Sequence, residues 1–218
     1  MNDNLDSDKN ANRRTTPPSR EFLDFISSQW ASPEKPATKQ DLVAPFAKGR
    51  RKKVAQQFPG KLIVIKAGSP KTRSNDTDYR YRPHAAFAHL TGWGSKTVAD
   101  SVLVIDTRES TKEILFLRPT AGKDSDEFFA NPAIGEFWVG ARPTLEEVSK
   151  LLDLDTRDLA ELDSYLGDEP TIDLESADLA QFVSEMRLIK DSYEIEQMRL
   201  AVAASIAGFE DVVRILPE

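Results

Sequence analysis

Three short runs of aliphatic and β-branched residues in the middle of the chain predict the strands of a β-sheet. The runs cover residues 61–66, 101–106 and 113–118, and each has the continuous apolar character of a buried strand. A short polar connection separates the second run from the third, so these two should pair as an antiparallel hairpin. Helical patterns flank the runs. We therefore expect an α/β fold in which helices flank a mixed β-sheet.

Helices are predicted where apolar residues recur at three- and four-residue spacing. The ranges with this spacing are 20–30, 39–57, 124–130, 144–152, 157–165 and 192–216. Residues 71–84 are polar and charged, which is typical of a loop. The short apolar segment 87–90 follows, and we place it at a junction between that loop and a strand.

The pattern at the carboxyl end is the most informative for organisation. Asp191 and Glu194 have the spacing of a capping box, which starts a helix. An apolar stripe then runs for roughly six turns. It consists of Ile195, Met198, Val202, Ser205, Phe209, Val212 and Leu216. A helix of this kind must bury its stripe, either on the first domain or a second copy, or on a partner domain that lies outside the sequence.

The uneven distribution of polar residues divides the chain into three parts. Residues 1–38 form a polar extension, which we expect to be mostly disordered apart from the short helix at 20–30. Residues 39–172 contain the predicted sheet and have the composition of a globular domain. Residues 173–218 should be a linker followed by the long helix.

Composition and charge narrow the possible partners. Hydrophobic residues make up 39% of the 218 positions and charged residues 30%, which still allows a core. A formal net charge of −7 argues against nucleic acid or an anionic membrane as the main partner. The chain has no cysteine and no apolar stretch near the roughly 20 residues of a membrane span. The first residues lack a signal-peptide pattern, so we expect a cytoplasmic protein.

Candidate catalytic chemistry is sparse. His84 and His89 are the two histidines of the chain, and no paired carboxylate motif accompanies them. Such isolated histidines are more typical of ordinary polar residues than of metal ligands. Glycine-rich phosphate loops, dinucleotide fingerprints and serine-nucleophile motifs are absent from the sequence. We therefore predict no catalytic residue and no bound metal in this chain.

Charges of both signs gather between residues 71 and 82. The basic side chains are those of Lys71, Arg73, Arg80 and Arg82, which surround Asp76, Asp78 and Tyr79. One interpretation is an anion-binding site. The favoured one is a charge-paired loop that braces the fold, because opposite charges satisfy each other. Trp93 and Trp138 are expected to anchor the core or an interface.

Several of these segments resemble the amino-terminal domain of aminopeptidase P. Residues 73–82 (RSNDTDYRYR) and 87–92 (FAHLTG) are similar to its signature, and residues 136–142 (EFWVGAR) to its Glu-x-Trp-x-Gly-x-Arg element. Residues 186–201 are similar to the junction where the family's catalytic domain begins. The motif residues, expected to be structural, are Arg73, Asp78, Tyr79, Arg82, Gly92, Trp138, Gly140 and Arg142. The likeness extends over residues 40–218.

The resemblance implies an Xaa-Pro aminopeptidase, whose substrate is a peptide with proline at the second position. It implies a fold like the amino-terminal domain of creatinase and aminopeptidase P, with residues 192–216 as the first helix of a pita-bread catalytic domain. That domain binds two divalent metal ions, usually manganese, through two Asp, one His and two Glu, and the metal pair activates a water. These ligands are not in this chain, so the chain alone is expected to be inactive.

The resemblance also implies a homo-dimer or homo-tetramer. In the family this domain borders a neighbouring subunit's active site, which makes Phe87, His89 and Trp93 candidates for a pocket wall or interface. His89 stands where the family commonly has Tyr, and Ala88 where some members have a large aromatic residue. We expect these differences to change the shape of the pocket.

Two other functions remain open. One is a related pita-bread enzyme of the prolidase or creatinase type, whose distinguishing residues lie downstream. The other is a non-catalytic, peptidase-like module that binds proteins or peptides, which the acidic balance permits. The Thr-Gly and Trp-x-Gly-x-Arg elements favour the enzymes.

Overall fold

A computed structural model describes residues 19–31, 37–75 and 77–216 of the chain. The described residues contain a five-stranded sheet with the order β6-β5-β4-β1-β7. Its strands are β1 (Leu62–Lys66), β4 (Val102–Asp106), β5 (Lys112–Leu117), β6 (Asp155–Asp158) and β7 (Thr171–Ile172). Strand β4 pairs antiparallel with β1 and β5, whereas β6 and β7 pair parallel with β5 and β1. The sheet is therefore mixed, and the predicted hairpin is confirmed.

The three predicted strands form the centre of this sheet, and each observed end lies within one residue of the prediction. Ile63 and Ile65 point into one core, and Leu62 and Val64 point into a second core on the other face. Successive side chains of a strand alternate between faces. A strand that is covered on both sides therefore needs a continuous apolar run, which is the pattern that made these strands predictable.

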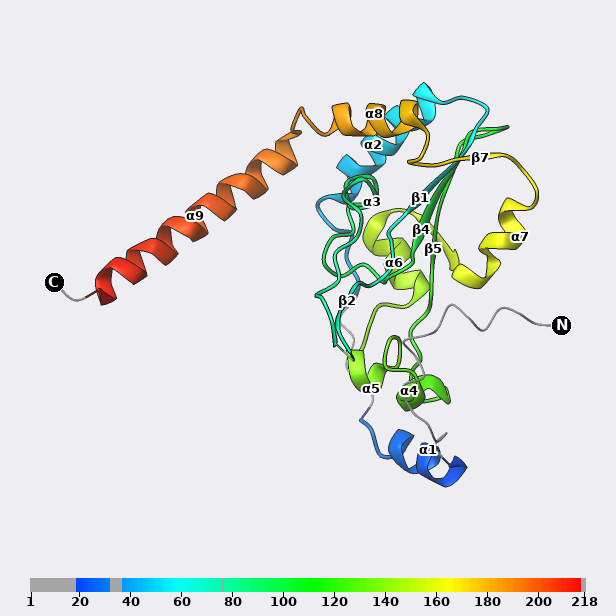
Figure 1. Ribbon diagram of the computed structural model, residues 1–218, viewed down its shortest axis with the longest axis vertical. Coiled ribbons are helices and arrows are strands. Elements are labelled where there is room, and N and C mark those ends of the chain that lie inside the picture. The colour runs from blue at the N-terminus through cyan, green and yellow to red at the C-terminus, as the bar shows by residue number, and fades with distance from the viewer. Residues whose placement is uncertain (1–18, 32–36, 76, 217–218) are drawn as a thin grey trace.

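Helices cover both faces of the sheet unequally (Figure 1). The larger core lies under α2 (Ala44–Gln57), α3 (Ala85–Thr91), α6 (Leu145–Leu152) and α8 (Ala177–Met186). The smaller core is covered by a 3-10 turn (Leu159–Glu161) and by α7 (Leu162–Leu166). The fold is thus an α/β arrangement with helices on both sides of a mixed sheet, as predicted.

The junction predicted around residues 87–90 is wrong, because these residues belong to helix α3. His84 starts the helix, and its Nδ1 accepts a hydrogen bond from the backbone N–H of Ala86 at 3.3 Å. Gly92 ends the helix in a left-handed conformation with φ +73°. Histidine is not among the usual helix caps, and seven residues are too few to show a periodic pattern.

Two polar segments form strands that hydrophobic patterning did not predict. The predicted loop at 71–84 contains an exposed hairpin of β2 (Thr72–Ser74) and β3 (Thr77–Asp78). Strand β6 lies where we predicted the start of a helix at 157–165, and the helical part begins only at Leu159. The sequence of β6 is Asp-Thr-Arg-Asp, so its pairing with β5 is imposed by the sheet and not by its own side chains.

Helix α8 lies within the segment predicted as a linker. Its Leu179 and Val183 are buried in the larger core, beside residues of β1 and α2. The core therefore extends past residue 172. Helix α2 also differs from the prediction at its start, since it begins at Ala44 and leaves Leu42 77% exposed.

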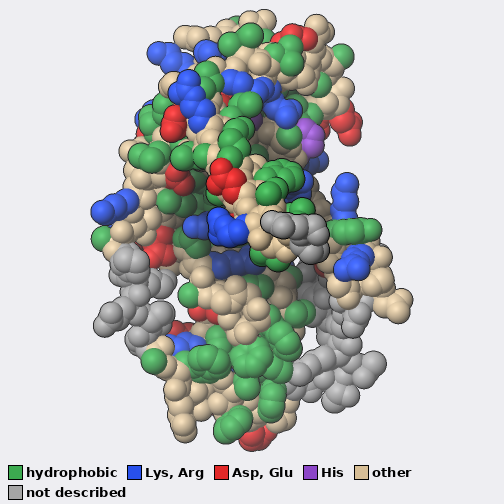
Figure 2. Space-filling view, turned by 90° about the vertical axis from the view of Figure 1, so that its left-hand side faces the viewer, with side chains coloured by type: hydrophobic (Ala, Val, Ile, Leu, Met, Phe, Trp, Pro, Cys, Tyr) green, Lys and Arg blue, Asp and Glu red, His purple; other side chains and the backbone are tan. Residues whose placement is uncertain are grey.

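A satellite aromatic cluster lies at the end of the molecule that is lowest in Figure 1. Helix α1 (Arg20–Ser27) packs there against the short helix α4 (Glu127–Ala130), and α4 packs against α5 (Glu136–Val139). The ring centroids of Phe22 and Phe129 are 5.1 Å apart, and those of Trp30 and Phe128 are 5.8 Å apart. An ion pair of 2.6 Å between Arg20 and Asp126 borders the cluster. In Figure 2, hydrophobic side chains gather at this lower end.

Gly92, at the end of α3, lies so close to the start of α2 that a larger residue has no room there. A Cβ atom there would lie 2.7 Å from Cγ1 of Val43. Replacing Gly92 with Ala is expected to lower the free energy of unfolding by about 2–3 kcal/mol, from left-handed backbone strain plus this clash. Urea unfolding monitored by circular dichroism measures the change.

The matched control is Gly60→Ala. Gly60 also has a positive φ, of +68°, but a Cβ there meets nothing within 4 Å. The free energy of unfolding of Gly60→Ala should fall by only about 1 kcal/mol, which is the contribution of backbone strain alone. Equal losses for the two variants would show that the contact with Val43 is unimportant.

Candidate functional site

The position of helix α9 (Ser192–Ile215) calls for a functional explanation. The helix leaves the globular part and extends away from it (Figure 1), and none of its 24 residues is buried. The capping box is confirmed: Oδ1 of Asp191 accepts the N–H of Glu194 at 3.0 Å, and Oε2 of Glu194 accepts the N–H of Asp191 at 3.1 Å. The predicted apolar stripe therefore lies on a helix, which ends one residue before Leu216, and its apolar residues are exposed.

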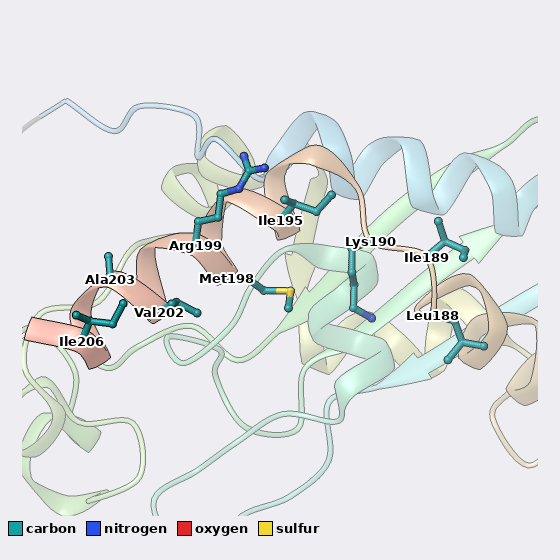
Figure 3. Close-up of a pocket in the computed structure, with 9 residues that line it drawn as sticks. All are labelled: Leu188, Ile189, Lys190, Ile195, Met198, Arg199, Val202, Ala203 and Ile206. Atoms are coloured by element: carbon teal, nitrogen blue, oxygen red, sulfur yellow. The ribbon is translucent and has the colours of Figure 1, made fainter. Parts of the chain in front are cut away.

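An apolar groove lies where the chain turns from α8 into α9 (Figure 3). Its volume is about 670 Å³. Leu188 and Ile189 line it from the connection, and α9 contributes Ile195, Met198, Val202, Ala203 and Ile206. Lys190 and Arg199 are the charged residues of the lining. The groove is thus continuous with the apolar stripe of α9.

A buried arginine connects the first turn of α9 to the globular part. The side chain of Arg50, on α2, is only 8% exposed. Its Nη2 lies 2.6 Å from Oδ2 of Asp191 and 3.5 Å from Oε2 of Glu194. Its Nη1 donates to the carbonyl oxygen of His89 at 2.9 Å. One guanidinium therefore contacts both acidic residues of the capping box and the end of α3.

His89 completes this cluster from α3. Its Nδ1 lies 3.4 Å from Oε1 of Glu194, its side chain is 7% exposed, and its Nε2 is buried with no hydrogen-bond partner among the described residues. Burial and the nearby charge of Arg50 lower the pKa of His89 to about 4. The imidazole is therefore neutral near pH 7.

Asp191 stays ionised in this setting. Burial raises its pKa, but the backbone N–H of Glu194 and the guanidinium of Arg50 outweigh that effect and hold the pKa below its usual range. Next to it, the ring of Tyr193 packs on that of Phe46, with centroids 5.5 Å apart. Charge pairing and ring packing together attach the start of α9 to α2.

Residues 47–171 match the sequence family described as the aminopeptidase P N-terminal domain. The chain belongs to this family. It is 32% identical over 220 residues to Xaa-Pro aminopeptidase 1 of Streptomyces coelicolor, covering 91% of this chain and 44% of the relative. Xaa-Pro aminopeptidase 2 of the same organism is 31% identical over 216 residues, covering 89% and 45%. The chain thus spans less than half the length of these relatives.

Among solved structures, aminopeptidase P from E. coli in a low-pH form is similar to this chain. Its TM-score is 0.47 at 24% sequence identity, and the match covers 58% of this chain and 27% of that one. The family assignment rests on the sequence match and not on this structural likeness.

The three residues predicted to line a pocket wall do not share a surface in this domain. Phe87 and Trp93 are buried in the larger core, whereas His89 lies at the start of α9. Nε1 of Trp93 has no hydrogen-bond partner among the described residues. The role of these residues in a pocket wall stays a prediction.

The family-motif residues between 73 and 82 are exposed on and after the β2–β3 hairpin. They are Arg73, Asp78, Tyr79 and Arg82. Within the part of the chain that the structure describes, no ion pair involves Lys71, Arg73, Arg80 or Arg82, so the predicted charge pairing is not seen there. Asp76, which that prediction included, lies outside the described residues.

The second motif stabilises the satellite aromatic cluster. Nε1 of Trp138 donates to the carbonyl oxygen of Phe129 at 2.8 Å, although about half of the Trp138 residue is exposed. Gly140 ends α5 with φ +73°, and Arg142 is half-buried after it. The structural role expected for Trp138, Gly140 and Arg142 stays a prediction.

Sequence reasoning missed Arg50 and its neighbour Arg51. A signal existed for Arg51, because the buried positions of α2 at helical spacing are Ala44, Ala47, Arg51 and Val54. An arginine inside an apolar stripe indicates a buried charge that must have partners.

Two features are absent from the described residues. These residues contain no group of three or more His, Cys, Asp or Glu side chains able to hold a metal ion. Their helices include none that is both long and apolar enough to cross a bilayer.

The depressed pKa of His89 makes stability depend on pH. The folded value of about 4 is below the ordinary 6.5, so the unfolded chain binds the proton more readily. This contribution to stability is complete above pH 6.5 and is lost as the pH falls toward 4. Between pH 7 and 4.5, the free energy of unfolding of the wild type should fall by on the order of 2 kcal/mol more than that of His89→Gln. Urea unfolding across this range measures both slopes.

The variant His84→Gln serves as the control and should keep the wild-type slope, because it leaves His89 in place. A slope that is unchanged in His89→Gln would mean that other groups produce the pH dependence.

Proposed function

We propose that this chain is the amino-terminal part of a longer Xaa-Pro aminopeptidase, which releases the residue that precedes a proline at the second position of a peptide. Its membership in the aminopeptidase P N-terminal domain family supports this, as do the names of its relatives. The observation that carries the proposal is α9. This helix extends away from the globular part, and none of its residues is buried against the other described residues.

The exposed stripe indicates a missing surface on energetic grounds. Burying a side chain such as Ile, Met, Val or Phe stabilises a protein by about 1.5–3 kcal/mol relative to leaving it exposed. Ile195, Met198, Val202, Phe209 and Val212 are all at least 40% exposed on α9. We propose that a catalytic domain following α9 in the longer protein covers this stripe and the groove beside Leu188.

The catalytic chemistry is proposed to lie outside this chain. In the longer protein, two divalent metal ions, manganese in our proposal, would activate the water that attacks the peptide bond. The described residues offer no set of ligands for such a pair. No catalytic step is therefore assigned to them.

The role proposed for this domain is structural. We propose a homo-dimer or homo-tetramer in which the domain helps to wall the active site of a neighbouring subunit. Phe87 and Trp93 are buried, so they would act by holding α3 in place and not by touching the substrate. The half-buried Ala88 lies on the same helix.

Aminopeptidase activity should distinguish the 218-residue chain from the longer protein. We expect the 218-residue chain to release no amino-terminal residue from an Xaa-Pro peptide, with or without Mn²⁺, because its described residues provide no ligand set. The longer protein with Mn²⁺ should release that residue, as measured by chromatography of the products. A dipeptide Xaa-Pro, tested in parallel, distinguishes a prolidase. Metal-dependent release by the short chain that is lost in His84→Ala or His89→Ala would contradict the proposal.

Hydrogen exchange should show that α9 lacks its partner. In a dilute, monomeric sample of the 218-residue chain, the amides of residues 196–215 should exchange faster than those of β4, because α9, although it is a formed helix, is not buried against the other described residues. In the longer protein the same amides should be protected. Strong protection in the monomeric short chain would mean that α9 packs on this domain, and protection only at high concentration would mean that a second copy covers it.

A further inference from the structure

The attachment of α9 is confined to one place. From Ile195 onward, every hydrogen bond and ion pair that the structure describes stays within the helix itself. The contacts with the globular part come from Asp191, Tyr193 and Glu194. A helix of 24 residues is about 36 Å long. A small change in this first turn therefore displaces the far end of α9 by a large distance.

The first turn is bound through both carboxylates of the capping box. Oδ1 of Asp191 and Oε2 of Glu194 accept the hydrogen bonds of the cap itself. The other oxygens face outward: Oδ2 of Asp191 accepts from Nε and Nη2 of Arg50, and Oε1 of Glu194 faces Nδ1 of His89. The same two residues thus start the helix and fix it to α2 and α3.

Arg50 has the geometry to control direction as well as attachment. Its Nε and Nη2 both donate to Oδ2 of Asp191, at 3.1 and 2.6 Å, and its Nη1 donates to the carbonyl oxygen of His89 at 2.9 Å. A planar guanidinium held at three points cannot rotate freely. Because Nη2 also lies 3.5 Å from Oε2 of Glu194, these contacts restrict the orientation of the capping box relative to the end of α3.

We propose that Arg50 is a positioning residue that sets the direction in which α9 leaves the domain. This inference deepens the proposed function, since a domain that follows α9 would inherit its orientation from this contact. It is nevertheless a property of the 218-residue chain alone, so it can be tested without any activity.

The test measures the distance between α9 and α2 by pulsed electron paramagnetic resonance. The chain has no cysteine, so Lys52→Cys on α2 and Glu210→Cys on α9, both exposed, can be spin-labelled uniquely. With Arg50 present, one narrow distance distribution is expected. With Arg50→Met, which keeps the apolar stem but removes the guanidinium, the single peak should be lost to a broad distribution.

Two further variants separate charge pairing from other effects. Asp191→Asn retains a good helix cap but loses the negative charge, so it should also broaden the distribution. Lys48 is also on α2, where it forms an exposed ion pair with Asp153. Lys48→Met breaks this pair and should leave the distance distribution unchanged. Circular dichroism melting of each variant confirms that the domain is folded.

A narrow, unshifted distribution in folded Arg50→Met would overturn the proposal, as would equal broadening in Lys48→Met. If Arg50→Met does not fold, Asp191→Asn decides the question, and an unchanged peak there overturns the proposal. None of these outcomes depends on whether the longer protein is an Xaa-Pro aminopeptidase.

Discussion

Two adjacent arginines on α2 connect the parts of this domain. Nη1 of Arg50 and Nη1 of Arg51 each donate, at 2.9 Å, to a carbonyl oxygen in the last turn of α3, those of His89 and Leu90. The last carbonyls of a helix have no partner within the helix, and positive charge is favourable there. The two arginines thus provide hydrogen-bond donors for the last carbonyl oxygens of α3, and the same bonds attach α3 to α2.

The two side chains then diverge. Arg51 is fully buried, and its Nε lies 2.6 Å from Oε2 of Glu113 on β5. Removing one partner of such a buried pair costs about 3–5 kcal/mol, because the other charge remains unpaired. Arg50 points instead to the start of α9. Helix α2 therefore joins the sheet to the outgoing helix, so the stability of the core and the geometry of the junction depend on the same element.

This arrangement explains which features could be predicted from the sequence. The central strands were predictable because burial on both faces demands continuous apolar runs, and the start of α9 because Asp191 and Glu194 signal it locally. Helix α3 was not, since it is short and begins at a histidine, which is an unusual cap, and strand β6 was not, since a polar strand depends on its pairing with the sheet. The junction was missed for a similar reason. Its key cation is separated from Asp191 by 141 positions, and no local pattern relates residues so far apart.

The satellite aromatic cluster includes residues of the amino-terminal extension, all of them within the described segment 19–31. Helix α1 lies outside the matched region 47–171, yet its Phe22 and the following Trp30 pack on rings of α4 and α5, which lie inside it. The boundary of the family and the boundary of the folded unit therefore do not coincide. A shortened protein that began at residue 47 would present an uncovered aromatic surface to solvent, and such surfaces favour self-association.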